Sequence, residues 1–500
     1  MHVAIIVDPA RLWRWQLMLA DALAEGGGHR VVCVEAAAGP VLPTAVAALL
    51  AIERRLASRS DSAAPQRPSD RIDPGELAAY AGTAAPSADA DLAIDLAGGI
   101  SDTPRAKRVL RPLFDGRASD QGVIDAVLSR RTPAIHIQDS ARPAAATAAR
   151  PARDTPHSLS RGLDNVFSRA AELLLAIVNG EAIPDEGNGP GLSSGRQRLR
   201  SAPRFLFDSV ADRLSRTTAR LAGTAPRWQI GWRRAGHGGV RADFRLSLDS
   251  YRWLPDDDHV WYADPFARFH DGRHHVLCEA FDERTQKGVI AAFVVGADGT
   301  PSRPETVLER PYHLSYPLLF EHDGQIFMMP ETSNNATVEL YRAERFPDRW
   351  QHHATVLDGI VADDATLIQY NGRWWLFAGT RHWASTCWDA LSLFHAASPF
   401  GPFEPHPLNP VLIDARAARP GGDMVVRDGV LWRPAQDCTR RYGSGLSICR
   451  VDVLDPGSFR QTRVVDVDPA GWRGARGLHT LNHVAGLELI DIYAPRRRPA

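Results

Sequence analysis

Acidic residues recur in the second half of the chain at matching distances from a glycine. Asp264 and Asp364 each lie eight residues before a glycine that follows Asp or Asn. Glu279 and Glu331 each lie seven residues after such a glycine. Carboxyl groups that are forced together raise at least one pKa, which places a proton donor beside an ionised partner. Glycosidic-bond chemistry uses such a pair, because one group protonates the leaving oxygen and the other acts as base or nucleophile.

A tight turn predicts how the first two of these carboxylates are placed. The Asp-Gly pair at residues 271–272 favours a two-residue hairpin turn, since both turn positions need a left-handed backbone. Residues 261–279 would then form two antiparallel strands, and simple pairing across the turn sets Asp264 opposite Glu279. One hairpin would bring both carboxylates to its open end.

Variants of this hairpin occur five times, and their spacing predicts the fold of the second half. The turn glycines lie roughly 50 residues apart, which is typical of a β-propeller with one blade per repeat. They are Gly272, Gly324, Gly372, Gly429 and Gly486. Five repeats predict five blades, and a strand at residues 227–233 would complete the last blade and close the ring. The alternative is an irregular β-sandwich, because the repeats share little sequence outside their turns.

The innermost strands of a propeller line a central channel, so equivalent hairpin ends gather at one mouth of it. We expect Asp264, Glu331 and Asp364 to form a functional cluster there. Further residues at the same or adjacent positions, which would contact a substrate, are Glu279, Tyr316, Asp363, Arg419, Asp437 and His479. The alternative is a polar ring with a purely structural role.

Carboxylate clusters also suit Ca²⁺ or Mg²⁺, so a metal site is the competing interpretation. The sequence has neither a DxDxDG loop nor an HExxH pair, and we therefore predict no metal. It also lacks a GxGxxG loop after its first strand, so we predict no dinucleotide and no other cofactor.

Residues 1–180 have a different pattern, which predicts an α/β Rossmann-like domain. Its opening reads as a β-α-β unit, with a strand at 2–7, a helix at 11–24 and a strand at 30–34. The later strands are expected at 89–97 and 134–137, and the later helices at 122–129 and 160–179. Ala-, Pro- and Arg-rich runs at 57–88 and 141–156 are expected to form mobile loops.

Residues 181–225 read as a linker between this domain and the propeller at 226–500. Its first part is rich in Gly, Pro and Ser, whereas residues 196–222 are basic and have helical spacing. We interpret this part as a helix packed between the domains. The alternative is a helix that touches a membrane surface, because positive charge accompanies its apolar positions.

Composition limits the partners and the compartment. The chain has 500 residues, with 58 Lys and Arg against 59 Asp and Glu, so no nucleic-acid partner is expected. No apolar run of about 18 residues occurs, so no membrane span is expected. The N-terminus lacks the pattern of a signal peptide, and the five cysteines form no CxxC pair. A cytoplasmic location fits these features.

Residues 227–500 resemble a known domain, found at the N-terminus of plant glucosamine inositolphosphorylceramide transferases and in bacterial proteins of polysaccharide loci. The resemblance rests on the segments WYADPF (261–266), SYPLLFEHDG (315–324), MPE (329–331), DATL (364–367), GRWWLF (372–377), RPAQDC (433–438) and YG (442–443). That domain is similar to the five-bladed propellers of arabinanase-, xylosidase- and fructosidase-type glycoside hydrolases.

The resemblance implies individual roles for the acids. In those hydrolases the Ala-Asp-Pro motif carries the base or nucleophile, which implies that role for Asp264. Glu331 is then the proton donor, and Asp364 or Glu279 tunes its pKa. The order here is Glu then Asp, whereas the hydrolases usually run Asp then Glu. This departure keeps a non-catalytic glycan-binding module of a biosynthetic complex open as the second hypothesis, and the lack of a secretion signal favours it.

The N-terminal half resembles a degenerate formyltransferase-type domain through Arg14-Trp15-Gln16 and the strand at 91–98. A working enzyme of that type needs an Asn, a His near a Ser-Leu-Leu-Pro-like turn and a later Asp, and no such run occurs. Formyl or acyl transfer to an amino sugar is therefore the third hypothesis, and a scaffold role is preferred. The leading hypothesis is a carbohydrate-active protein that acts on or binds a glycan, glycolipid or glycosyl donor at the propeller channel.

Overall fold

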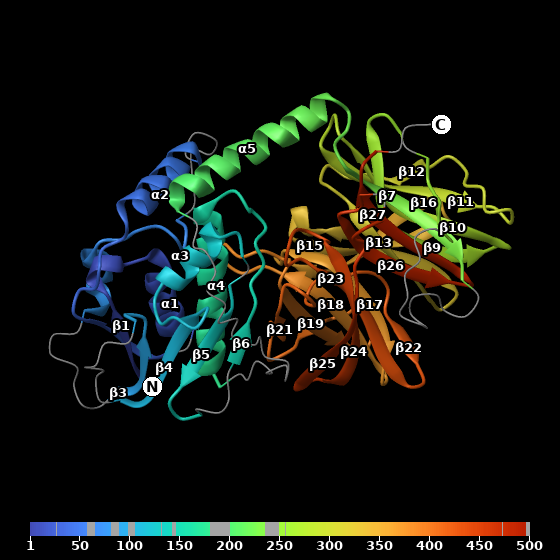
Figure 1. The fold of residues 1–500 in the computed structure, drawn as a ribbon. Coiled ribbons are helices and arrows are strands. Elements are labelled where there is room, and N and C mark those ends of the chain that lie inside the picture. Colours follow the sequence, from blue (N-terminus) through green and yellow to red (C-terminus); the bar gives the residue numbers. More distant parts are fainter. Residues whose placement is uncertain are drawn as a thin grey trace. The chain divides into compact units, whose positions relative to one another are not determined.

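The chain forms two compact units in its computed structural model (Figure 1). The first comprises Met1–Ser215 with His382–Thr386, and the second comprises Arg216–Arg381 with Cys387–Ala500. The structure describes residues 1–26, 28–57, 66–81, 90–98, 106–131, 133–142, 147–180, 201–235, 250–255, 257–472 and 474–496. Residues 58–65 and 82–88 of the loop predicted at 57–88, and the Gly/Pro/Ser-rich start of the linker, lie outside these ranges. No helix within them is long and apolar enough to span a membrane.

The first unit contains a mixed six-stranded sheet in the order β2-β1-β3-β4-β5-β6. Four neighbouring strands are parallel: β2 (Arg30–Glu35), β1 (His2–Val7), β3 (Ala90–Asp95) and β4 (Ala106–Phe114). The last two, β5 (Ile135–Asp139) and β6 (Thr147–Ala149), run antiparallel. The predicted β-α-β opening is confirmed, because β1 and β2 pair in parallel on either side of a helix. Strand β4 was not predicted, since its charged and apolar residues alternate irregularly.

Helices complete the first unit. They are α1 (Arg14–Glu25), α2 (Thr44–Ala57), α3 (Gln121–Leu128), α4 (Leu159–Val178) and the first part of α5 (Ala202–Leu221), with short 3₁₀ helices η1 (Pro9–Arg11) and η2 (Pro74–Tyr80). Helix α4 is buried on nearly all sides, and its Phe167 contacts Trp13, Trp15 and Phe114. This aromatic cluster joins α4 to the start of α1 and to the end of β4.

The second unit is the five-bladed propeller that the repeats predict. The first blade comprises β9 (Val260–His270), β10 (Arg273–Asp282), β11 (Lys287–Val295) and β12 (Glu305–Leu308). The second comprises β13 (Ser315–His322), β14 (Gln325–Thr332), β15 (Thr337–Arg345) and β16 (Arg349–Asp358), with η4 (Ser333–Asn335) after β14. The third comprises β17 (Ala362–Tyr370), β18 (Arg373–Thr380), β19 (Ala390–Ala396) and β20 (Glu404–Pro405), with β21 (Leu412–Ile413) beside β19. The fourth comprises β22 (Val425–Arg427), β23 (Val430–Asp437), β24 (Gly445–Asp455) and β25 (Ser458–Val467).

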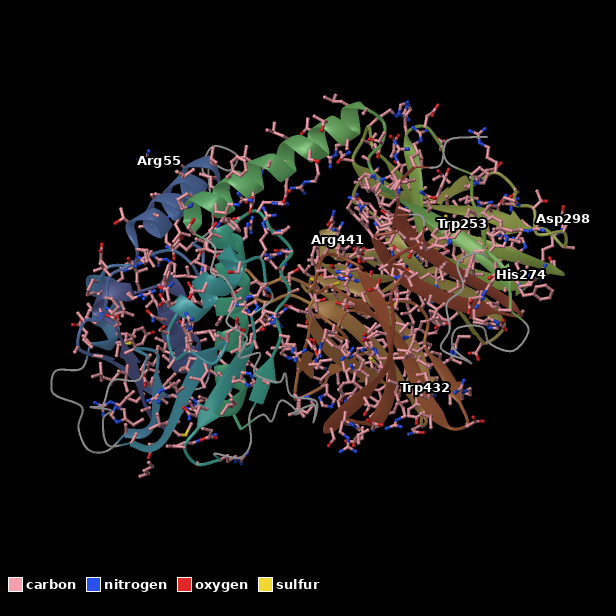
Figure 2. The ribbon with its side chains drawn as sticks, viewed as in Figure 1. Arg55, Trp253, His274, Asp298, Trp432 and Arg441 are labelled. Carbon is pink, nitrogen blue, oxygen red and sulfur yellow. The ribbon has the colours of Figure 1, made fainter. Side chains whose placement is uncertain are left out.

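The fifth blade closes the ring with strands from both ends of the unit. It comprises β26 (Gly477–Val484), β27 (Leu487–Ala494), β7 (Arg227–Arg234) and β8 (Arg252–Trp253). β27 pairs along its whole length with β7, as predicted. Trp253, which Figure 2 labels, belongs to β8. Its ring stacks on that of Trp472 at 5.0 Å between ring centroids. The two ends of this unit are therefore joined by hydrogen bonds within one blade as well as by packing.

Apolar side chains fill the space between neighbouring blades. One cluster lies between each adjacent pair, including the pair formed by the fifth and first blades. Trp374 belongs to the cluster between blades two and three, and Trp375 to the one between blades three and four. Because neighbouring residues of a strand point to opposite faces, both tryptophans serve the core.

The five predicted turns adopt the expected conformation. Each turn glycine has a positive φ between 71° and 77°, and the residue before it also has a positive φ. Two successive left-handed residues match the twist of a hairpin, so the turns set the strand pairing near them. His270 faces Arg273 as expected.

The pairing further from the first turn differs from the prediction. Glu279 pairs with Ala263, not with Asp264, because a β-bulge inserts an extra residue into β9. Asp264 stands in this bulge with a left-handed backbone (φ 50°). The second and third blades repeat the bulge at Tyr316 (φ 44°) and Asp364 (φ 51°). Simple pairing counted from the turn missed the bulge, because the extra residue shifts the register by one residue.

Candidate functional site

Bulges on the inner strands position the central side chains. The first strands of the blades are innermost: β9 contacts both β13 and β26, and β13 contacts β17. A bulge redirects its side chain out of the normal alternation. Asp264 and Asp364 thereby become buried within the ring, with only 3% and 1% of their surface exposed. Left-handed backbone at a residue other than glycine costs roughly 1 kcal/mol, which Asp tolerates better than most residues.

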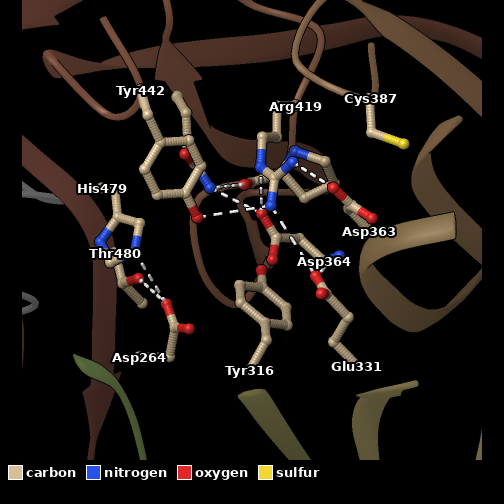
Figure 3. A network of polar contacts seen from close by, with 12 residues as sticks. Asp264, Tyr316, Glu331, Asp363, Asp364, Cys387, Arg419, Tyr442, His479 and Thr480 are labelled. Carbon is tan, nitrogen blue, oxygen red and sulfur yellow. Dashed lines mark hydrogen bonds and ion pairs between the residues drawn. The ribbon is translucent and has the colours of Figure 1, made fainter. Parts of the chain in front are cut away.

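One half of the site is built around Arg419 (Figure 3). Its Nε lies 2.6 Å from Asp364 Oδ2, and a terminal nitrogen lies 2.5 Å from Asp363 Oδ2. The other terminal nitrogen lies 3.7 Å from Glu331 Oε2 and donates to the Tyr442 hydroxyl at 3.3 Å. Glu331 Oε2 also accepts the backbone N–H of Asp364 at 3.0 Å. Arg419 therefore compensates three carboxylates with one positive charge.

The other half is a chain of two carboxylates and an imidazole. His479 Nδ1 lies 2.7 Å from Asp491 Oδ1, and its Nε2 lies 3.3 Å from Asp264 Oδ1. Asp264 also accepts a hydrogen bond from the Thr480 hydroxyl at 2.8 Å and donates its backbone N–H to Asp491. Because a carboxylate faces each ring nitrogen, His479 is held in one orientation and can pass a proton toward Asp264.

Aromatic rings and an amide join the two halves. Trp228 stacks on His479 at 3.8 Å between ring centroids, and Tyr442 packs edge-on against the same imidazole at 5.2 Å. Tyr442 also lies under the Arg419 guanidinium, 4.9 Å from its ring centroid. Gln436 donates to Asp364 Oδ2 at 2.7 Å, and its own carbonyl oxygen has no hydrogen-bond partner among the described residues.

Glu279 forms the edge of this acid cluster, which we define as Asp264, Glu279, Glu331, Asp363, Asp364 and Asp491. The carboxylate of Glu279 lies 3.3 Å from His313 Nε2. Glu279 is buried, and its pairing with Ala263 keeps it within electrostatic reach of Asp264. It therefore belongs to the cluster although it does not face Asp264 across the hairpin.

Burial and crowding favour the protonated forms of several acids. Burial raises the pKa of Asp264 to about 6, with His479 opposing and Asp491 adding to the shift. Burial raises the pKa of Glu331 well above its usual range, and Asp363 and Asp364 raise it further. Burial, together with Asp264, does the same to the pKa of Glu279. The pKa values of these neighbouring carboxyl groups are therefore raised to different degrees, which favours a proton on some of them more than on others.

The same buried environment also shifts the pKa values of Asp364 and His479. Burial raises the pKa of Asp364, although Arg419 opposes that shift. Burial lowers the pKa of His479, but Asp491 and Asp264 outweigh it and leave the pKa above its usual value. A charged His479 is therefore favoured by the carboxylates on both sides of it.

Two residues expected at the channel mouth have other environments. The Asp437 carboxylate accepts hydrogen bonds from the backbone and hydroxyl of Thr439, so it stabilises its own loop. Tyr316 is fully buried, and its hydroxyl contacts Thr366 Oγ1 and accepts the Gly422 N–H. Tyr316 therefore packs beneath the acid cluster and presents no free ring face.

Sequence reasoning missed Asp491, Thr480 and Trp228 as parts of this site. Asp491 carried a signal, because it is one of the two acids in the otherwise apolar run at 487–492 and lies near His479 across a predicted hairpin. Thr480 and Trp228 carried none. Asp264, His479 and Asp491 each offer a ligand atom within 4.8 Å of the others, which makes them a candidate metal-binding group within the described residues. Their mutual hydrogen bonds describe a proton-sharing chain equally well.

The first unit has a separate cavity of about 460 Å³. Segments that follow β1, β2 and β3, and the end of β4 with the loop after it, line the cavity, which therefore lies at the carboxyl edge of the parallel strands. Asp8 already accepts the backbone N–H groups of Ala10 and Gly39 there, and Asp120 pairs with Arg11. These two amides are therefore already hydrogen-bonded to Asp8.

The fold and the site together describe a five-bladed β-propeller with a buried acid cluster among its inner strands. Residues 257–483 match the family model "Glucosamine inositolphosphorylceramide transferase 1, N-terminal". Glucosamine inositolphosphorylceramide transferase 1 of Oryza sativa subsp. japonica is 34% identical over 228 residues, and that of Arabidopsis thaliana is 30% identical over 228 residues. Each match covers 43% of this chain and 30% of the relative, so the chain spans under a third of those proteins.

Solved structures of glycoside hydrolases are also similar to this chain. A family 117 glycoside hydrolase of Zobellia galactanivorans has 13% identity and a TM-score of 0.36, covering 54% of this chain and 91% of that chain. An exo-1,5-α-L-arabinanase from a bovine ruminal metagenomic library has 14% identity and a TM-score of 0.32, covering 49% of this chain and 100% of that chain.

Proposed function

We propose that the propeller binds a glycan or the sugar part of a glycolipid at its acid cluster and breaks or transfers a glycosidic bond there. The observation that carries this proposal is the buried set of carboxyl groups in which the pKa of Asp264 is raised to about 6 and that of Glu331 is raised well above its usual range. The two relatives are glucosamine inositolphosphorylceramide transferases, and this similarity supports a substrate that contains a hexosamine and a lipid.

Asp264 is the proposed base or nucleophile. With a pKa of about 6 it is largely ionised at neutral pH, and His479 stabilises that charge. It would take the proton of an attacking hydroxyl group or attack the anomeric carbon itself. Glu331 is the proposed acid, because burial raises its pKa well above its usual range and the leaving oxygen needs a proton. Asp364 would then tune Glu331 through the Arg419 contact that they share.

The charge balance favours the uncharged part of such a substrate. Arg419 already contacts Asp363, Asp364 and Tyr442, and His479 is held between two carboxylates. Neither cation is left without an anionic neighbour, so a phosphate would have to displace a carboxylate. Sugar hydroxyls, in contrast, can donate to carboxylate oxygens. We therefore propose that the site takes a sugar ring and leaves any phosphate outside.

Binding without catalysis is the second candidate function. Its support is the burial of Asp264 and Asp364 and the hydrogen bonds that their oxygens already accept. Gln436 also stands where the equivalent position of the first two blades has a glutamate. An amide at that position cannot exchange a proton, so it suits recognition.

Substitution of Asp264 by Asn tests the proposed chemistry. We expect Asp264→Asn to lower turnover at least about 100-fold, because it removes the group that exchanges the proton. Turnover would be followed by mass spectrometry with a panel of glucosamine- and N-acetylglucosamine-containing glycosides and glycolipids, and sugar affinity by isothermal titration calorimetry. Affinity should stay within a few-fold of the wild-type value.

Asp437→Asn is the matched control, because that carboxylate serves its own loop. It should retain wild-type turnover. Wild-type turnover in Asp264→Asn would remove the assigned role. Sugar binding by the wild-type protein without any product would support the binding function instead.

A further inference from the structure

Helix α5 exposes a stripe of large apolar side chains, which we call the apolar stripe: Leu206, Phe207, Val210, Leu214 and Leu221. Phe207 is 65% exposed and Leu214 is 63% exposed. Leu206, Val210 and Leu214 follow at intervals of four, and Phe207, Leu214 and Leu221 at intervals of seven. These intervals place all five on one side of a helix with about 3.6 residues per turn. A contiguous exposed patch of this kind marks an interaction surface.

A different face of α5 packs on the first unit. Phe205 and Ser209 are buried, and the Arg130 guanidinium lies 5.9 Å from the Phe205 ring centroid. Arg130 also forms an ion pair of 2.6 Å with Asp212. The helix is therefore anchored through one side, and the apolar stripe is not the face that the described part of the chain uses for packing.

Arginines accompany the apolar stripe. Within α5 they are Arg204, Arg213, Arg216 and Arg220. The sequence adds Arg196, Arg198 and Arg200 just before the helix. The two acidic residues of α5 face cations, since Asp208 lies 3.0 Å from Arg204 and Asp212 contacts Arg130. An apolar face with a net positive border suits a helix that lies at a bilayer surface, with its apolar side among acyl chains and its arginines near anionic headgroups.

We propose that α5 docks this chain on the surface of a membrane that contains anionic lipid. The helix is 20 residues long and continuous (Figure 1), so the whole stripe can lie flat on one plane. It does not cross the bilayer, because it is not apolar enough to do so. The proposal stands on α5 alone and does not depend on the chemistry of the acid cluster.

Vesicle sedimentation with the full chain tests this proposal. We expect the protein to sediment with vesicles of phosphatidylcholine mixed with phosphatidylglycerol, and much less with vesicles of phosphatidylcholine alone. Added salt should weaken the binding, because it screens the arginines from the headgroups. Phe207→Ser combined with Leu214→Ser should lower the vesicle-bound fraction at least about tenfold, since two large apolar groups no longer leave water.

Phe269→Ser combined with Val426→Ser is the matched control, because both side chains are exposed on the propeller. This control should bind vesicles as the wild type does. Circular dichroism and thermal unfolding should show that both double variants fold. Absence of wild-type binding to the anionic vesicles would overturn the proposal, as would unchanged binding in the α5 variant. A dimer detected by light scattering and abolished by the α5 variant, without vesicle binding, would assign the stripe to a second copy of the chain.

Discussion

At the scale of single residues, the carboxyl groups of the acid cluster outnumber the cations that contact them. The carboxyl groups of Asp264, Glu279, Glu331 and Asp364 have raised pKa values, with burial as the largest cause in each case. Ionising all of them in a dry interior would be costly, so the folded protein retains protons that the unfolded chain has released. The same imbalance that suits proton transfer therefore makes stability depend on pH.

Asp264→Asn should change that pH dependence. The raised pKa of the Asp264 carboxyl group in the folded protein stabilises the fold at low pH. This stabilisation is lost as the pH rises from the unfolded pKa of 3.8 through the folded pKa of about 6. The raised pKa of His479 acts in the same direction, because its stabilising proton is lost as the pH rises through it. The free energy of unfolding of the wild type, relative to the variant, should fall on the order of 2 kcal/mol across this range.

Urea unfolding at several pH values between about 4 and 8 measures this difference. Subtracting the variant profile from the wild-type profile removes the contribution of carboxylates elsewhere in the chain. Parallel profiles would contradict a raised pKa at Asp264, and a difference that grows with pH would show that the pKa is lowered.

Bulges and close backbone contacts position the site at the scale of elements. Three inner strands have a left-handed residue at the bulge, and the segment just before β22 approaches β26 closely at Gly422. Gly422 has a φ of 125° and donates its N–H to the Tyr316 hydroxyl at 2.8 Å. A Cβ atom there would lie 2.3 Å from the Leu481 carbonyl oxygen. The packing beneath the acid cluster thus requires a glycine.

Gly422→Ala should therefore destabilise the propeller more than a comparable substitution in an open turn. Gly429→Ala is the matched control, because its φ is 76° and no atom lies within 4 Å of the added Cβ. The control should cost roughly 1–2 kcal/mol from the backbone conformation alone. Gly422→Ala adds a clash with backbone that cannot rotate away, and should cost clearly more. Equal free energies of unfolding in urea would show that β26 can move aside.

Closure of the propeller is the decisive feature at the scale of the whole molecule. β7 precedes the first blade in sequence but pairs with β27 near the other end of the chain. Its Ile230 and Trp232 are buried in the cluster between the fifth and first blades. Without β7, β27 would present an unpaired edge and that cluster would lose two large side chains.

A fragment of residues 216–500 should fold as a propeller, whereas a fragment of residues 250–500 should not. The shorter fragment lacks β7, so its fifth blade cannot close against β27. We expect a cooperative urea transition for the longer fragment, and aggregation or a strongly lowered transition midpoint for the shorter one. Equal midpoints would mean that ring closure contributes little to stability.

Local chemistry allowed much of this fold to be predicted. Asp-Gly and Asn-Gly pairs set the hairpin turns because their conformation depends on only two residues. Their spacing predicted the five blades, and the strand at 227–233 was expected to close the ring. The prediction that Asp264, Glu331 and Asp364 lie near one another came from their equivalent positions in the repeats, because equivalent hairpin ends gather at one mouth of the channel. A strand at 134–137 was also predicted and corresponds to β5, whereas β4 and β6 had no comparable local signal.

The sequence by itself determined where the turns lie, how many blades they define and which acids have equivalent positions. Only the tertiary structure decided that a bulge separates Asp264 from Glu279, that Asp437 turns to its own loop and that Asp491 holds His479. A turn is decided by neighbours in the chain. A bulge, a buried charge and its partner are decided by blades that are distant in sequence, and by the low dielectric that forms when those blades close around them.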